Sequence, residues 1–166
     1  MDMHTIVDDW KTNAQRHDDR NFAFLRSLKM KSERPVDQAA QQLHEEAFSL
    51  IDCCQCANCC KMISPRFTQA DIRRVAKHLA ISAAQFQATY LQADEDGNLH
   101  LKTRPCPFLG ADNRCTIYAV RPQDCCEYPH TQKKRFATRT HGHAANALVC
   151  PAVFYIVEQL RVRRQN

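Results

Sequence analysis

Five cysteines fall within eight consecutive residues of this chain, from Cys53 to Cys60. The segment reads Cys-Cys-Gln-Cys-Ala-Asn-Cys-Cys, so that two residues separate Cys53 from Cys56 and two separate Cys56 from Cys59. This spacing lets a tight turn aim both sulfur atoms of a pair at one ion, as in zinc knuckles and ferredoxin-type loops. A chain with such a segment is expected to fold around a metal centre.

The remaining cysteines supply enough sulfur for more than one centre. Thiolate is a soft ligand that selects zinc, iron or iron–sulfur clusters, whereas magnesium and calcium prefer oxygen. Adjacent side chains tend to diverge, so Cys59 and Cys60 should serve two ions more easily than one, which favours two centres or one polynuclear centre. Cys54 and Cys126 are expected to be surplus thiols. The predicted ligands are Cys53, Cys56, Cys59, Cys60, Cys106, Cys115, Cys125 and Cys150.

Disulfide bonds are the alternative use of so many cysteines, and they form in oxidising compartments. Residues 1–10 have no basic start, apolar run or small-residue cleavage site typical of a secretion signal. No apolar stretch approaches the roughly 20 residues that a membrane-spanning helix needs. The sequence therefore favours a cytoplasmic protein outside the membrane, in which clustered thiols serve metal or redox chemistry.

The size and composition of the chain suit one globular domain, since 44% of its 166 residues are hydrophobic and 25% are charged. We expect a single domain over residues 1–166, with an N-terminal helical segment at 1–34 and a cysteine-cluster core at 35–166. The formal net charge of +5 counts every cysteine as neutral. Eight thiolates and two divalent ions would reduce it to about +1, which weakens an inference of nucleic-acid binding from overall charge.

Helical patterns dominate the chain. Apolar residues at helical spacing predict one helix over residues 20–31 and a second from Pro35 to about Ile51, directly before the cysteine segment. Thr68–Asp71 has the pattern of a capping box, and Ser82–Gln85 is expected to begin the next helix in the same way. We therefore predict a mainly α fold, a small helical domain with short strands and loops organised around the metal centre.

The distant cysteines fall at predicted turns and helix ends. Proline on both sides of Cys106 excludes a helix there, and residues 110–113 read as a turn before Cys115, so these two cysteines should flank a loop. Residues 99–103 alternate as a short strand does. Pro151 suits the first turn of a last helix, which places Cys150 near its N-cap, where the helix dipole favours a thiolate.

An ordered set of motifs adds a family resemblance. Cys53-x-x-Cys56-x-x-Cys59-Cys60 is followed by Cys106-Pro107-Phe108-Leu109, by Cys115-Thr116-Ile117-Tyr118 and by Arg121-Pro122-x-x-Cys125. The set resembles the CxxCxxCC family of proposed zinc- or iron-chelating proteins, also called YkgJ-type cysteine-cluster proteins, and spans at least residues 53–130. The resemblance implies metal binding through the seven motif cysteines, with Cys150 a looser match and with Cys54 and Cys126 outside the motif.

The identity of the metal stays open at this point. A Cys-x-x-Cys-x-x-Cys segment followed by a distant Cys-Pro, here Cys150-Pro151, resembles the ligand set of a [4Fe–4S] cluster. Cys60 departs from that pattern, because three spacers would follow Cys59 in a ferredoxin. The sequence thus leaves two alternatives, a zinc- or iron-binding protein of unknown role and an iron–sulfur redox protein or enzyme component with a protein redox partner. No catalytic motif assigns a reaction.

Other candidate residues have ordinary explanations beside the functional ones. His130 follows the last cluster cysteines and could ligate metal or move protons, or it could be a surface residue. Arg121 could donate hydrogen bonds to a thiolate, or form a salt bridge. The basic stretch of residues 133–139 makes a zinc-stabilised nucleic-acid-binding module a third hypothesis, although a solvated basic loop is the commoner explanation of such a stretch. His141 and His143 would share a face only in an extended segment.

Overall fold

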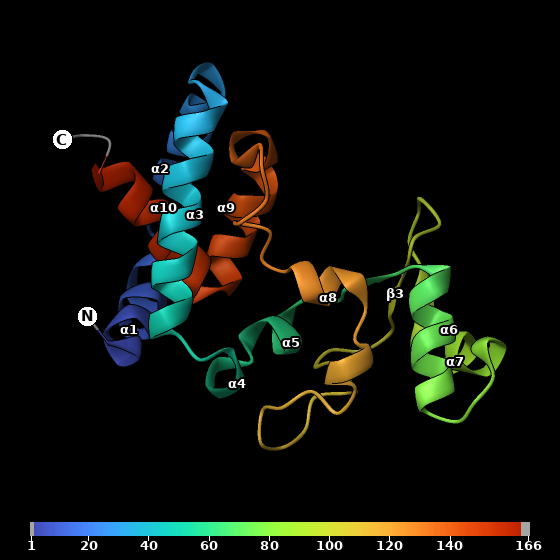
Figure 1. Ribbon diagram of the computed structural model, residues 1–166. Helices are drawn as coiled ribbons and strands as arrows, with labels where there is room; N and C mark the ends of the chain where they lie inside the picture. Colours follow the sequence, from blue (N-terminus) through green and yellow to red (C-terminus); the bar gives the residue numbers. More distant parts are fainter. Residues whose placement is uncertain (1, 164–166) are drawn as a thin grey trace. The chain divides into compact units, whose positions relative to one another are not determined.

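A computed structural model describes residues 2–163, and Figure 1 shows its helices and short strands. The described chain is mainly α-helical, which confirms the fold class expected from the sequence. Its residues divide into two compact units, one made of Met1–Cys53 with Pro129–Asn166 and the other of Cys54–Tyr128. We call them the helical unit and the cysteine unit. The single domain of residues 1–166 stays a prediction, and residues 1 and 164–166 lie outside the described part.

The helical unit is organised around its last helix, α10. This helix is buried nearly all round, from Pro151 to Val157 and again at Leu160, as expected of a helix in a protein interior. It packs against the helices α1, α2, α3 and α9. The elements of this unit are α1 (Met3–Asn13), α2 (Asp18–Ser27), the 3₁₀ turns η1 (Leu28–Met30) and η3 (Phe136–Arg139), α3 (Glu33–Leu50), α9 (Thr140–Val149) and α10 (Pro151–Arg163).

The predicted helices of this unit are present. The helix expected at residues 20–31 is α2 with its 3₁₀ extension η1, and the one expected from Pro35 is α3, which begins two residues earlier. Helices α1 and α9 were not predicted. The polar helix α1 buries Ile6 alone, and its N-terminus is capped by the Asp2 side chain, which accepts a hydrogen bond from the Thr5 N–H. Such a helix shows little apolar periodicity.

Helix α9 turns its two histidines in different directions, because residues two apart do not share a helix face. His141 is exposed, whereas His143 is 1% exposed and stacks on the Phe136 ring at a centroid distance of 3.9 Å. The pKa of His143 is lowered to about 4, mainly by burial, with the charges of Arg139 and His130 acting in the same direction. His143 is therefore a neutral core residue of the helical unit.

The cysteine unit combines short helices with a small antiparallel sheet in the order β1-β3-β2. The central strand β3 pairs Arg66 with His100 on one side and Leu91 with Leu101 on the other. Its elements are α4 (Cys53–Cys56, whose first residue belongs to the helical unit), α5 (Asn58–Met62), β1 (Arg66–Phe67), α6 (Gln69–His78), α7 (Ala83–Tyr90), β2 (Leu91–Ala93), β3 (Leu99–Leu101), the 3₁₀ turn η2 (Tyr118–Val120) and α8 (Gln123–Glu127).

The predicted helix starts of this unit are confirmed. The Thr68 side chain accepts from the Asp71 N–H while the Asp71 carboxylate accepts from the Thr68 N–H, which completes the capping box of α6. The Ser82 hydroxyl accepts from the Gln85 N–H at 3.1 Å and caps α7. The expected strand at residues 99–103 is β3, at Leu99–Leu101.

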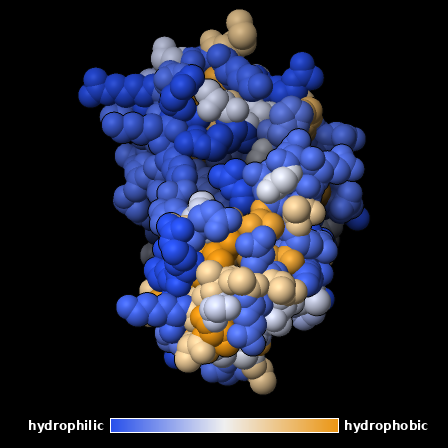
Figure 2. Space-filling model, turned by 90° about the vertical axis from the view of Figure 1, so that its right-hand side faces the viewer, coloured by the Kyte–Doolittle hydropathy of each residue, from blue (hydrophilic) through white to orange (hydrophobic). Residues whose placement is uncertain are grey.

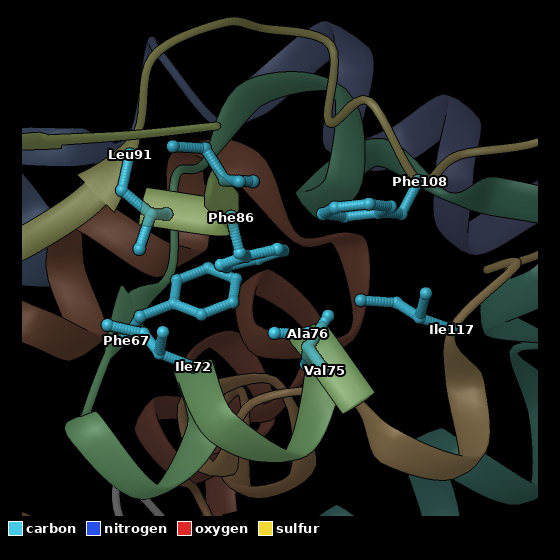
Figure 3. Close-up of a cluster of buried hydrophobic side chains, with 9 residues drawn as sticks. Phe67, Ile72, Val75, Ala76, Phe86, Leu91, Phe108 and Ile117 are labelled. Atoms are coloured by element: carbon cyan, nitrogen blue, oxygen red, sulfur yellow. The ribbon is translucent and has the colours of Figure 1, made fainter. Parts of the chain in front are cut away.

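An aromatic core stabilises the cysteine unit (Figure 3). Phe86 of α7 is fully buried, and its ring contacts those of Phe67, Tyr90 and Phe108. Helix α6 adds its apolar face to this cluster, as Figure 3 shows for Ile72, Val75 and Ala76. The partly buried side chains of Cys106 and Cys115 pack against the same cluster. The core thereby anchors two of the predicted metal ligands.

The surface is largely polar. Hydrophilic residues predominate on the face in Figure 2, and apolar residues gather in one region of it. Among the residues that the structure describes, no helix has the length and apolar character needed to cross a bilayer. The large apolar side chains that stay exposed are Met30, Met62, Tyr118 and Val162.

The buried imidazole of His143 predicts acid sensitivity of the helical unit. In the unfolded chain its pKa is about 6.5, and in the folded unit about 4. The unfolded state therefore binds the proton more tightly, so the stabilisation is complete above pH 6.5 and is lost as the pH falls towards 4, on the order of 3 kcal/mol. The indole N–H of Trp10, the one tryptophan of the chain, donates to the Ala147 carbonyl of α9, so its fluorescence during urea unfolding reports this unit.

The His143→Leu variant tests this prediction. We expect a smaller loss of unfolding free energy between pH 7 and pH 4.5 than in the unchanged protein, because the titrating group is gone. The matched variant His141→Leu, at an exposed position of the same helix, should keep the full loss. An unaltered pH dependence in His143→Leu would show that this residue does not control acid stability.

Candidate metal centre

Two short helices, α4 and α5, present the five clustered cysteines. Between them Ala57 adopts a left-handed conformation, with φ of 47°, and its side chain is buried. This conformation costs a residue with a Cβ atom about 1 kcal/mol, and it interrupts what would otherwise be one helix. The tight turn expected between the paired cysteines is thus a break between two helical turns.

The thiols of Cys59 and Cys60 approach each other, although neighbouring side chains were expected to diverge. Their sulfur atoms lie 4.0 Å apart at the start of α5. The hydrogen bond from Cys59 lowers the pKa of Cys60 to about 7, against the opposing effect of burial, and the Lys61 ammonium acts in the same direction as Cys59. About half of the Cys60 thiols are therefore ionised near neutral pH.

A backbone hydrogen bond brings Cys106 to the cysteine segment from a distant part of the chain. Its N–H donates to the Cys60 carbonyl at 2.8 Å. A second hydrogen bond joins the same two segments, because the Ser64 hydroxyl donates to the Leu101 carbonyl at 3.2 Å. The segment after Cys60 and the segment before Cys106 therefore run alongside each other, and the pairing of β1 with β3 continues this arrangement.

The loop between Cys106 and Cys115 folds back on itself, as the sequence predicted. Leu109 forms an antiparallel bridge with Cys115, and the Gly110 N–H donates to the Arg114 carbonyl at 2.8 Å. A Cβ atom on Gly110 would lie 3.2 Å from that carbonyl oxygen, which is closer than a side chain is comfortably placed. Cys106 and Cys115, at the two ends of this loop, both pack against the aromatic cluster.

Helix α8 carries Cys125, and a buried carboxylate on α6 holds the start of this helix in place. Asp71 is 1% exposed, and its side chain accepts a hydrogen bond from the Gln123 N–H at 3.1 Å. Arg74, which is paired with Asp71, donates to the carbonyl oxygens of Val120 and Arg121 at 3.3 and 2.9 Å. We call Asp71 and Arg74 the α6 clamp, because together they fix the residues before Cys125.

Four thiols from separate segments influence one another electrostatically. The pKa of Cys106 is raised to about 11, mainly by burial, with negative charge on Cys60 or Cys115 acting in the same direction. Burial likewise raises the pKa of Cys125 and of Cys115, and both respond to charge on Cys60. The charge of Arg121 lowers the pKa of Cys115. The four sulfur atoms therefore gather in one region of the cysteine unit.

The other predicted ligands do not all belong to the same unit. Cys56 and Cys59 belong to the cysteine unit, whereas Cys53 is the last residue of the first segment of the helical unit and Cys150 lies between α9 and α10. The Cys150 carbonyl accepts from the Phe154 N–H at 3.0 Å, which is the expected N-cap position. Charge on Cys54 raises the pKa of Cys115, so this thiol, taken as surplus, also lies near the gathered sulfur atoms. The eight-ligand set stays a prediction.

The donor chemistry of the gathered thiols fits zinc or iron. The cysteines at 56, 59, 60, 106, 115 and 125 are half-buried. Nearby thiolates repel one another in such surroundings, and a cation removes that repulsion. Within residues 2–163, no three Cys, His, Asp or Glu side chains already stand in a geometry that would hold an ion. Rotation of the cysteine side chains would have to draw the sulfur atoms together.

Part of the basic stretch of residues 133–139 forms hydrogen bonds and ion pairs within the helical unit. The Asp37 carboxylate accepts from the N–H groups of Arg135 and Phe136 at 2.8 and 2.9 Å, and the Arg135 side chain pairs with Glu33. Arg139 donates to the carbonyl oxygens of Lys134 and Arg135. These contacts account for two of the basic side chains as structural residues, and nucleic-acid binding by this stretch stays an untested hypothesis.

Comparison with known proteins agrees with the motif set. Residues 52–143 match the family model CxxCxxCC, described as a proposed zinc- or iron-chelating domain. The match covers more than half of the chain, contains the seven predicted ligands from Cys53 to Cys125 and ends before Cys150. No curated protein and no solved structure matches the chain.

The α6 clamp predicts that Asp71→Asn releases the segment that carries Cys125. Loss of the buried charge removes the pairing with Arg74 and weakens the bond from the Gln123 N–H, which should lower the free energy of unfolding by roughly 2 kcal/mol. In the reduced, metal-free protein Cys125 should then be alkylated faster, as measured by peptide mass spectrometry. Glu95→Gln removes a charge from an exposed position of the same unit and should leave this rate unchanged.

The low pKa of Cys60 predicts selective alkylation. In the reduced, metal-free protein the rate at Cys60 should rise with a midpoint near pH 7, while Cys106, with a pKa of about 11, should react far more slowly at neutral pH. Cys59→Ala removes the hydrogen bond and should move the Cys60 midpoint towards the ordinary value of about 8.5. Equal rates at Cys60 and Cys106 would contradict this account of the site.

Proposed function

The chain belongs to the CxxCxxCC family, and from this premise we propose that it binds zinc or iron through the thiolates of its cysteine unit. The observation that carries the proposal is the gathering of Cys60, Cys106, Cys115 and Cys125 from separate segments into one region. The backbone bond between Cys106 and Cys60 supports it, because this bond positions two of the donors. Clustered cysteines in such number are typical of metal or redox chemistry in a reducing compartment, and we propose the cytoplasm as the location.

The primary ligands in this proposal lie in the cysteine unit, at Cys56, Cys59, Cys60, Cys106, Cys115 and Cys125. Cys53 and Cys150 complete the proposed set of eight, which is enough for two four-coordinate centres. The sulfur separation of 4.0 Å between Cys59 and Cys60 supports centres that lie together, or one polynuclear centre that both thiols share. A [4Fe–4S] cluster is the alternative for such a centre.

The residues of the chain have separate tasks in this proposal. Cys60 is partly ionised at neutral pH and would engage an ion first, whereas Cys106, Cys115 and Cys125 release their protons on binding. The Arg121 guanidinium offsets thiolate charge at Cys115. Bound zinc would stabilise the fold and bound iron could also transfer electrons. The proposed role is structural or in metal handling, and redox chemistry with a protein partner is the alternative.

Removal of single ligands tests the proposal. Cys56→Ser or Cys59→Ser should lower metal affinity at least about tenfold, because serine is a poor ligand for a soft ion, and should destabilise the cysteine unit. Cys126→Ser is the matched control, since this exposed thiol stands directly after a proposed ligand. Metal content after purification under reducing, anaerobic conditions is the measurement.

The same preparation separates the remaining alternatives. Cys54→Ser should keep its metal, and a loss equal to that of Cys56→Ser would show that the surplus thiol is a ligand. Zinc without acid-labile sulfide would exclude the iron–sulfur cluster, whereas iron with stoichiometric sulfide would establish it. A folded and reduced protein that takes up neither metal would contradict the proposed function.

A further inference from the structure

One end of the helical unit concentrates positive charge. There the turn η1 joins α2 to α3, and the turn η3 packs against both η1 and α3. Residues 26–37 and 134–139, which we call the basic end, contain seven basic and two acidic residues. The basic residues are Arg26, Lys29, Lys31, Arg34, Lys134, Arg135 and Arg139. The basic end thus carries as large a net charge, +5, as the whole chain.

Both acidic residues of the basic end are engaged with Arg135. The Asp37 carboxylate accepts from the N–H groups of Arg135 and Phe136, and the Glu33 carboxylate lies 3.5 Å from the Arg135 Nε atom. These contacts hold η3 beside α3, and they do not neutralise the remaining cations. Within the described chain, the exposed basic side chains of this end that form no ion pair are Arg26, Lys29, Lys31, Arg34 and Lys134.

The start of α3 adds to this positive potential. A helix N-terminus carries a partial positive charge, so basic residues beside it slightly destabilise the helix. Lys31 and Arg34 nevertheless lie on either side of Glu33, the first residue of α3. Their charges do not stabilise this helix, and they strengthen the attraction of the basic end for an anionic partner.

An exposed apolar side chain distinguishes the kind of anionic partner. Met30 lies between Lys29 and Lys31 and is 88% exposed, the most exposed large apolar side chain that the structure describes. A membrane interface accommodates this combination, because apolar groups enter the boundary of the acyl chains while basic groups stay at the lipid phosphates. A single-stranded nucleic acid would favour exposed aromatic rings, but Phe136, the one aromatic residue of the basic end, is fully buried.

We propose that the basic end binds reversibly to the surface of a membrane that contains anionic lipids. Lys29 and Lys31 contact the headgroups in this mode, and Met30 inserts between them. Surface attachment of this kind requires no membrane-spanning segment. The inference does not rest on the proposed metal function, because the basic end belongs to the helical unit and the primary metal ligands to the cysteine unit.

Cosedimentation of the full-length protein with lipid vesicles tests the proposal. Vesicles of phosphatidylcholine with about 30% phosphatidylserine should retain the protein, because anionic lipids attract a polybasic surface. Vesicles of phosphatidylcholine alone should not retain it. Raising the salt concentration from about 50 to about 200 mM should weaken binding, since the attraction is screened.

Variants of the basic end separate the two parts of this mode. The double variant Lys29→Gln, Lys31→Gln should weaken binding to the anionic vesicles at least about tenfold. Met30→Ser should weaken it about threefold or more, whereas Met30→Leu should retain the affinity, because leucine is also apolar. The matched control is Arg73→Gln with Lys77→Gln, which removes two exposed charges from α6 and should bind as the unchanged protein does.

Trp10 fluorescence during urea unfolding verifies that the helical unit of each variant is folded. Equal retention by vesicles without phosphatidylserine, or no retention by either kind, would overturn the proposal. So would equal weakening by the control pair on α6, or an unchanged affinity of Met30→Ser. Single-stranded RNA that displaces the vesicles and binds independently of Met30 would assign the basic end to nucleic acid instead.

Discussion

The hydrogen bond from the Cys106 N–H to the Cys60 carbonyl is the contact on which the arrangement of the cysteine unit depends. It joins the compact cysteine segment to a loop that is distant in sequence, and the pairing of β1 with β3 extends the same contact into a sheet. The loop then returns through the bridge between Leu109 and Cys115, so that its second thiol reaches the core beside the first. A backbone bond suits this task because it fixes the chain without using a side chain that must serve as a ligand.

Several thiolates brought close together repel one another. The thiols of this unit differ in pKa, so they are not all ionised at the same pH. Burial and mutual repulsion favour the neutral thiol at Cys106, Cys115 and Cys125, whereas the contact with Cys59 favours the thiolate at Cys60. The unit does not depend on an ion for all of its stability, because an aromatic core around Phe86 and a buried carboxylate at Asp71 also hold these segments. Ligand binding and folding are therefore coupled but not identical in this unit.

Much of the fold was predictable from local patterns, and the rest required long-range contacts. The helix starts at Thr68, Ser82 and Pro151 follow from capping chemistry, and the loop between Cys106 and Cys115 follows from proline and glycine. The polar helix α1 and the alanine-rich helix α9 lack a clear apolar stripe, so their formation depends on packing against α10 and α2. The convergence of Cys59 and Cys60 and the α6 clamp could not be read from spacing, since both depend on tertiary geometry. The split into two units follows from the C-terminal helices packing with the N-terminal ones, which no local signal records.

The central position of α10 has a consequence for how the protein is made. Helices α1, α2 and α3 are synthesised before the cysteine unit, but the helix against which they pack, α10, is translated after it. At about 5–20 residues per second, the apolar faces of the early helices wait for several seconds without their partner. The cysteine unit is continuous in sequence, so it can assemble during this interval, and the nascent N-terminal helices are the segment for which a chaperone would matter most.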